Sequence, residues 1–160
     1  MDNPDGKQIV KQYTDWLRGE FNTDSYNSGL CEITLPFLNR RGTYIQVFVK
    51  RTDSGLMISD YGETIGDLRF CGLDIDTSAR REMLNRILRS FSVRLEGKDE
   101  LRTLASEDNL PHRLNELAQC MLAVDRMIFS TSPAKVARLA EEDFQVVRNS
   151  EKKQLTATRS

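Results

Sequence analysis

Apolar residues recur at helical spacing in five parts of the chain. Residues 7–21 carry an apolar stripe between polar residues, which predicts an amphipathic N-terminal helix: Ile9, Tyr13, Trp16, Leu17 and Phe21. The same spacing predicts helices over residues 60–71, 77–91, 110–129 and 136–147. Gly72 lies where a left-handed residue would end the second of these helices.

Alternation of apolar and polar residues predicts strands between the helices. Three candidates, "LCEITLPFL", "TYIQVFVKR" and "LMIS", are joined by the turn signals "NRRG" and "TDSG". Two more candidate strands flank Gly97-Lys98-Asp99. Residues 22–29 are rich in turn-forming residues and are predicted to interrupt the regular secondary structure. Pro36 lacks an N–H group, so its strand is expected at a sheet edge, or with the proline facing outward.

Together these elements predict an α+β fold. We expect a mainly antiparallel sheet of about five strands, a three-strand meander plus a hairpin, packed with helices. The pattern predicts a single domain over residues 1–148. Residues 149–160 contain almost no apolar side chains, which predicts a disordered tail.

The stretch "LMISDYGETIGDL" predicts a strand that runs directly into a helix, with Asp60, Tyr61 and Glu63 at the junction. In one interpretation Asp60 is the N-cap and Glu63 the third helical residue, as in a capping box. Asparagine would then replace Asp60 without loss, because it caps a helix equally well. In the other interpretation the junction is a functional turn that needs the carboxylate charge.

The long helix predicted over residues 110–129 has a seam of apolar residues spaced 4-3-4-3-4 from Leu110 to Ile128. Such a helix covers a sheet of its own chain or shares the seam with a second chain. We therefore predict a homodimer, with this candidate interface: Leu114, Leu117, Met121, Val124 and Ile128.

Composition narrows the chemistry. Three cysteines and a single histidine, His112, lack the spacing of a zinc site. The three cysteines are therefore predicted to be small core residues of a protein in a reducing cytoplasm. No apolar run reaches the roughly 20 residues of a membrane span, and the polar start of the sequence is unlike a secretory signal.

The net charge is −1, yet residues 40–94 hold ten basic and seven acidic side chains. Six arginines of this region are candidates for contact with a polyanion: Arg40, Arg41, Arg80, Arg81, Arg86 and Arg89. The alternative is a solvated helix face, since arginine is a good helix former.

The sequence contains no P-loop, G-x-G-x-x-G or H-E-x-x-H motif, so no catalytic residue and no cofactor is predicted. One alternative remains, a metal-dependent nuclease or nucleotide-processing enzyme. It would hold a divalent ion with Glu32, Asp60 and Glu63.

Four short motifs carry a family resemblance: "I-T-x-P-F" at residues 33–37, "Y-I-Q-V-F-V" at 44–49, "S-D-Y-G-E-T-I" at 59–65 and "L-x-x-x-G" at 68–72. Over residues 30–95 the chain resembles a bacterial and phage family catalogued as domain of unknown function 1828. The resemblance implies a mobile-element setting, as a component of anti-phage defence or an inhibitor of one, and no catalytic residue can be carried over. We expect a small non-enzymatic interaction module, with a protein partner favoured over nucleic acid.

Overall fold

The structure is a computed structural model that describes residues 3–130. By its internal contacts the chain divides into two units, Met1–Ile128 and Phe129–Ser160. The elements described below belong to the first unit, apart from the last residue of a short 3₁₀ turn. The helix predicted over residues 136–147 and the tail predicted over 149–160 lie outside the described residues, as does the predicted boundary at residue 148.

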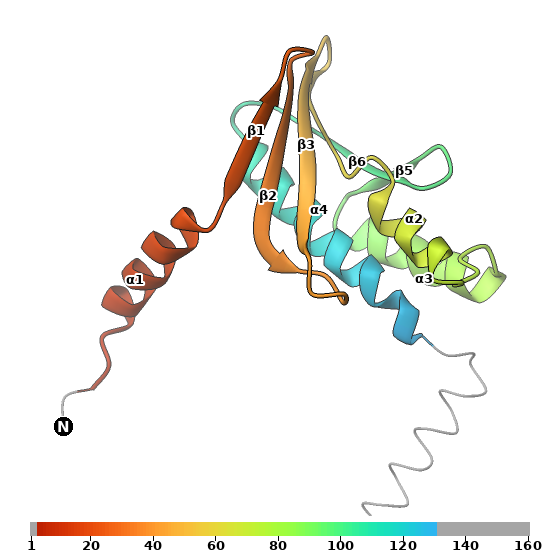
Figure 1. Cartoon of the computed structure of the whole chain (residues 1–160), viewed down its shortest axis with the longest axis horizontal. Helices are drawn as coiled ribbons and strands as arrows, with labels where there is room; N and C mark the ends of the chain where they lie inside the picture. Colours follow the sequence, from red (N-terminus) through yellow and green to blue (C-terminus); the bar gives the residue numbers. More distant parts are fainter. Residues whose placement is uncertain (1–2, 131–160) are drawn as a thin grey trace, which may run out of the picture. The chain divides into compact units, whose positions relative to one another are not determined.

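Helices and strands alternate in blocks along the described chain (Figure 1). The helices are α1 (Gly6–Gly19), α2 (Glu63–Phe70), α3 (Ser78–Ser90) and α4 (Leu110–Asp125), which continues into the 3₁₀ turn η1 (Arg126–Phe129). The strands are β1 (Asn22–Tyr26), β2 (Leu30–Leu38), β3 (Tyr44–Thr52), β4 (Gly55–Ser59), β5 (Arg94–Glu96) and β6 (Glu100–Ala105). Among the described helices, none combines the length and the apolar character needed to cross a membrane.

The six strands form one sheet in the order β1-β2-β3-β4-β6-β5, with every neighbouring pair antiparallel. The predicted α+β class is therefore confirmed, with one strand more than expected. The additional strand is β1, which pairs with β2 from Asn22↔Thr34 to Tyr26↔Leu30. Its side chains are polar or exposed along its whole length, so it lacks the alternation that predicts a strand.

Pro36 does not mark an edge strand, because β2 lies between β1 and β3. The pairing of β2 with β1 stops at Thr34, and the register between β2 and β3 shifts between Thr34 and Leu38. Pro36 thus occupies the irregular segment where a missing N–H removes no ladder bond.

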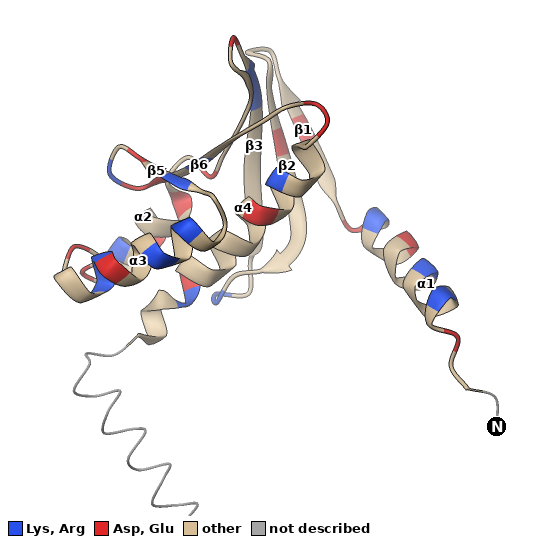
Figure 2. Cartoon of the chain, turned by 180° about the vertical axis from the view of Figure 1, so that it is seen from behind, with Lys and Arg blue, Asp and Glu red and all other residues tan. Residues whose placement is uncertain are grey.

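The core lies between one face of the sheet and the helices α2, α3 and α4 (Figures 1 and 2). Val47 of β3 and Ile58 of β4 are fully buried from the sheet side, and Leu117 and Val124 from α4. The apolar seam of α4 therefore packs against its own chain. Of the predicted interface, Leu117, Met121 and Val124 are buried, while Leu114 and Ile128 are half-buried at the margin of the same core.

The cysteines are not all core residues. Cys120 is buried, and burial raises the pKa of its thiol to about 12. Cys31 is half-buried, but Cys71 is exposed at the end of α2, which corrects the prediction of three core cysteines. Cys71 is the C-cap residue of α2 and directly precedes Gly72, whose φ of 89° ends the helix.

Candidate functional site: the hollow beside the turn from β4 to α2

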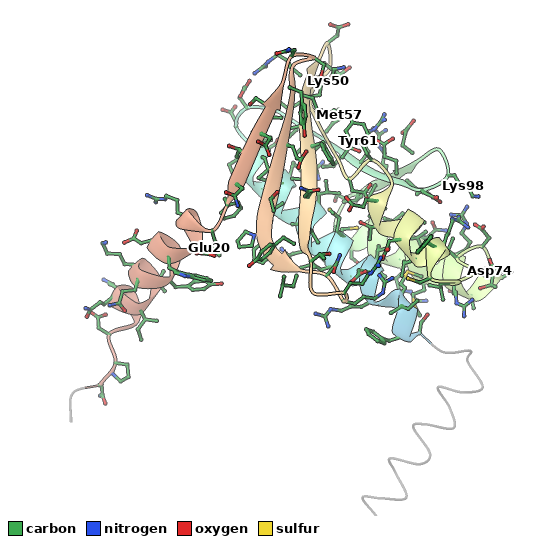
Figure 3. The ribbon with its side chains drawn as sticks, viewed as in Figure 1. Glu20, Lys50, Met57, Tyr61, Asp74 and Lys98 are labelled. Carbon is green, nitrogen blue, oxygen red and sulfur yellow. The ribbon has the colours of Figure 1, made fainter. Side chains whose placement is uncertain are left out.

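Strand β4 passes into helix α2 through a tight left-handed turn. Tyr61 and Gly62 have φ angles of 51° and 81°, and the Glu63 N–H donates to the Asp60 carbonyl over 3.2 Å. A positive φ is uncommon for a tyrosine. Its ring packs edge-on against Phe48, with the ring centroids 4.9 Å apart (Figure 3 marks Tyr61).

Asp60 is fully buried in this turn and accepts three backbone N–H groups. These come from Gly62 (2.8 Å), Thr64 (3.1 Å) and Leu101 (2.8 Å). Burial raises the pKa of the Asp60 carboxyl, and the hydrogen bonds oppose this rise. Asp60 therefore ties the first turn of α2 to strand β6.

The predicted capping box is wrong in its positions. The N-cap residue is Gly62, which has no side chain to bond the helix, and Glu63 is the first helical residue instead of the third. Asp60 still satisfies the Thr64 N–H, but it does so from outside the helix and across the left-handed turn. Glu63 consequently has no capping role, and its side chain needs another explanation.

Glu63 is exposed, and within residues 3–130 its carboxylate has no hydrogen bond or ion pair. Its pKa is raised, first by partial burial and then by the negative charges of Asp60, Asp67 and Glu32. Acids therefore surround this carboxylate, and no cation of residues 3–130 pairs with it.

A hollow of about 420 Å³ lies beside Glu63. Its lining comes from the turn between β2 and β3, the start of β3, the first turns of α2 and the end of α4: Asn39, Arg41, Thr43, Tyr44, Ile45, Gln46, Glu63, Thr64, Asp67, Met121 and Asp125. The volume is within the range of small-ligand sites, about 300–1,000 Å³.

The other two acids of the hollow are paired. Asp125, 5% exposed, accepts the Arg40 backbone N–H over 2.6 Å and also binds its guanidinium. Asp67 pairs with Arg41, and its Oδ2 lies 2.8 Å from Arg40 Nη2 in an ion pair without the geometry of a directed hydrogen bond. Glu63 therefore differs from its neighbours, because it alone of the three lining acids keeps an unpaired charge among the described residues.

Residues 35–124 match the model of a family described as Domain of unknown function DUF1828, which is more than half of the chain. The chain belongs to this family. The DUF1828 match contains the left-handed turn and every lining residue of the hollow except Asp125. Searches of the curated proteins and of the solved structures found no match.

The three acids of the alternative metal site do not form a metal-ligating group in the described part of the chain. The Glu32 carboxylate already has two hydrogen-bond partners on the sheet. It accepts from the Tyr26 hydroxyl and from Gln46 Nε2, each over 2.6 Å. Asp60 is occupied by backbone amides. Over residues 3–130 no group of three or more histidine, cysteine, aspartate or glutamate side chains is arranged to hold a metal ion.

The six candidate arginines lie in two places, Arg40 and Arg41 in the turn between β2 and β3, the other four on α3 (Figure 2 shows the charges along α3). Five of them already contact an oxygen of their own chain. Besides the pairs of Arg40 and Arg41, the contacts are Arg80 with the Asp74 carbonyl, Arg81 with Asp76 and Arg86 with Glu82. Arg40 has a side chain only 8% exposed, which makes it part of the interior and not of a surface patch.

Sequence reasoning singled out Glu63 but missed the hollow around it. Asp67 was also among the acidic candidates of the sequence, and it follows Glu63 by four residues on the same helix face. The role of Asp125 could not be predicted, because this residue comes from α4, 85 positions after Arg40. No local pattern indicates that the turn between β2 and β3 meets the end of α4.

Proposed function

We propose that this protein is a small, non-enzymatic interaction module of the cytoplasm that binds a protein partner. The hollow beside Glu63 takes a lysine or arginine side chain of that partner. The resemblance of the sequence to a family of phages and mobile elements suggests the setting, a component of anti-phage defence or an inhibitor of one.

The single observation that carries this proposal is the unpaired Glu63 carboxylate in a hollow whose other two acids are held by Arg40 and Arg41. An ammonium or guanidinium group placed there compensates the charge that Asp60, Asp67 and Glu32 make unfavourable. Gln46 contributes an amide to the lining, and Tyr44, 55% exposed, offers an aromatic face to a cation. A phosphate would meet the unpaired Glu63 carboxylate with repulsion, which favours a protein partner over nucleic acid.

The proposal is tested by titrating the ¹⁵N-labelled protein with N-acetyl-arginine amide and N-acetyl-lysine amide, followed by NMR. N-acetyl-citrulline amide is the matched control, because it has nearly the shape of arginine without the charge. We expect the cationic probes to shift the amide signals of Gln46, Glu63 and Thr64, and citrulline to leave them in place.

Glu63→Gln should abolish these shifts while the rest of the spectrum stays unchanged. Equal shifts with citrulline, or shifts that survive Glu63→Gln, would overturn the proposal. Melting with Mg²⁺ or Mn²⁺ tests the nuclease alternative in parallel. A ligand at 100 times its Kd stabilises by about 2.7 kcal/mol, so a metal-dependent rise in Tm would favour that alternative instead.

A further inference from the structure

Helix α1 presents an apolar face that the described part of the chain covers only at Leu17, which is half-buried. None of its residues is buried, and four large apolar side chains are more than half exposed: Ile9 (52%), Val10 (61%), Tyr13 (55%) and Trp16 (57%). The Tyr13 and Trp16 rings stack on each other, with centroids 6.1 Å apart. α1 thus carries a formed aromatic patch without a partner in residues 3–130.

Such a helix needs a partner to persist. Isolated helices shorter than about 12–15 residues are marginal in water, and α1 has 14 residues. Its N-terminus is capped by Asp5, which accepts the Lys7 N–H, and Lys11 pairs with Asp15. These local contacts contribute too little to hold a short helix, so its stability has to come from packing of the apolar face.

We infer that the partner is the α1 helix of a second copy of this chain, packed antiparallel about a two-fold axis at Tyr13. The apolar residues Ile9, Val10, Tyr13, Trp16 and Leu17 stand at −4, −3, 0, +3 and +4 relative to Tyr13. A two-fold axis demands a surface that is complementary to itself. In the antiparallel pair Ile9 lies level with the partner's Leu17, of equal size, and Val10 lies level with the partner's Trp16, a small side chain with a large one.

The charges at the ends of α1 complement each other in the same arrangement. Glu20 follows Trp16 by four residues, so it continues the line of the apolar face at the C-terminal end (Figure 3 marks Glu20). The two-fold axis brings it level with the partner's Gly6, the first residue of α1. There its carboxylate meets the positive end of the helix dipole and Lys7, next to the Asp5 side chain that caps the Lys7 N–H.

The neighbouring edge strand does not offer an equivalent two-fold contact. Antiparallel pairing of β1 with itself about its middle residue would place Asp24 opposite Asp24, and like charges directly opposite are destabilising. The size of the helix pair also sets its strength. The four aromatic side chains of the pair, at about 150–250 Å² each, supply about 600–1,000 Å², which with the aliphatic residues places the contact near the small end of specific interfaces, about 1,200 Å².

The inference goes beyond the proposed function, because it uses a different element and a different ligand. It is tested with the full chain by light scattering over micromolar to millimolar concentrations. We expect the mass to rise from 18.3 kDa toward twice that value, with a Kd in the micromolar range. Trp16→Asp should abolish the rise, whereas Gln8→Asp, which introduces the same side chain on the polar face of α1, should leave it unchanged.

A crosslink then tests the two-fold axis itself. In a chain with Cys31→Ser and Cys71→Ser, a Tyr13→Cys variant should form an intermolecular disulfide on mild oxidation, and Gln8→Cys should not. A mass of 18.3 kDa at every concentration would overturn the inference, since α1 would then serve a different partner. Association that survives Trp16→Asp in a folded protein would overturn it as well. Neither result bears on the NMR titration of the hollow.

Discussion

Asp60 and Leu101 hold each other by two hydrogen bonds in opposite directions. The Asp60 N–H donates to the Leu101 carbonyl over 3.1 Å, and the Leu101 N–H donates to Asp60 Oδ1 over 2.8 Å. The first bond prolongs the pairing of β4 with β6 by one residue, and the second replaces the backbone acceptor with a side chain. Because Asp60 also binds the first turn of α2, one buried carboxylate joins a strand, a turn and a helix.

Asp60→Asn should destabilise the protein by about 1–3 kcal/mol, the usual cost of leaving a buried polar group unsatisfied. An asparagine places an NH₂ group against either the Thr64 N–H or the two N–H groups bound by Oδ1, and a donor cannot satisfy another donor. The change is measured by urea unfolding. The capping-box interpretation expects no effect, so a silent Asp60→Asn variant would restore that interpretation.

Gly62→Ala should cost about 1–2 kcal/mol, the strain of a left-handed residue that carries a Cβ. An added Cβ would lie 3.5 Å from the Asp99 Cβ, an ordinary contact, so the φ angle of 81° and not crowding sets the cost. Gly66 in the same helix is the matched control, since its φ is not positive and its Cβ would meet open space.

Gly66→Ala should instead stabilise the protein by up to about 1 kcal/mol, because alanine is the better helix former. Thermal melting of the two variants should therefore move Tm in opposite directions. A Gly62→Ala protein as stable as the parent would mean that the turn relaxes without strain.

Arg40→Met should destabilise the fold by about 3–5 kcal/mol, the typical cost of breaking a buried ion pair. The variant leaves Asp125 buried without its counter-charge and removes the contact from Arg40 to Asp67. Arg41→Met is the control. That side chain is 53% exposed, and its loss should cost less than about 1 kcal/mol. Equal effects in denaturant melts would contradict the structural role of Arg40.

Glu63→Gln should raise Tm at neutral pH and have no effect well below pH 4.5, the ordinary glutamate value. A raised pKa means that the folded state holds this proton more tightly than the unfolded state. The contribution of Glu63 to stability is therefore fully present at low pH and is lost as pH rises from 4.5 through the folded pKa. Because glutamine does not ionise, the Glu63→Gln variant does not lose this stability as the pH rises.

The effect should stay below about 1 kcal/mol, because Glu63 is exposed to solvent. Glu107→Gln serves as the comparison: Glu107 pairs with Arg51, so neutralising it removes an attraction and should not stabilise. A pH-independent gain in Glu63→Gln would show that something other than charge is responsible.

Prediction from sequence succeeded where structure is decided within a few residues. The end of α2 shows this: Gly72 has a φ of 89°, its N–H donates to the Arg69 carbonyl, and the Leu73 N–H donates to the Leu68 carbonyl. This is the C-terminal motif that glycine favours, so the residue type alone indicated it. At the start of α3 the spacing left Asp76 and Thr77 as alternative N-caps, and the structure has Thr77, whose hydroxyl oxygen accepts the Arg80 backbone N–H.

Prediction failed at the other end of α2 for a physical reason. Spacing places Asp60 three residues before Glu63, but it carries no information that Tyr61 adopts a left-handed conformation, which only packing against Phe48 and the pairing with Leu101 explain. The hollow could not be predicted from the sequence for the same reason. Its walls come from segments distant in the sequence, and no periodicity connects Arg40 with Asp125.

The bond between Arg40 and Asp125 also sets an order of events during synthesis. Strands β2, β3 and β4 follow one another closely, so the meander can pair as soon as it leaves the ribosome. Helices α2 and α3 emerge first, but the core is complete only when α4 follows, and the β2–β3 turn is bound only when residue 125 is synthesised. Contacts of such long separation slow folding. The nascent protein is therefore most exposed to aggregation and to chaperones in the interval between the end of β4 and the end of α4.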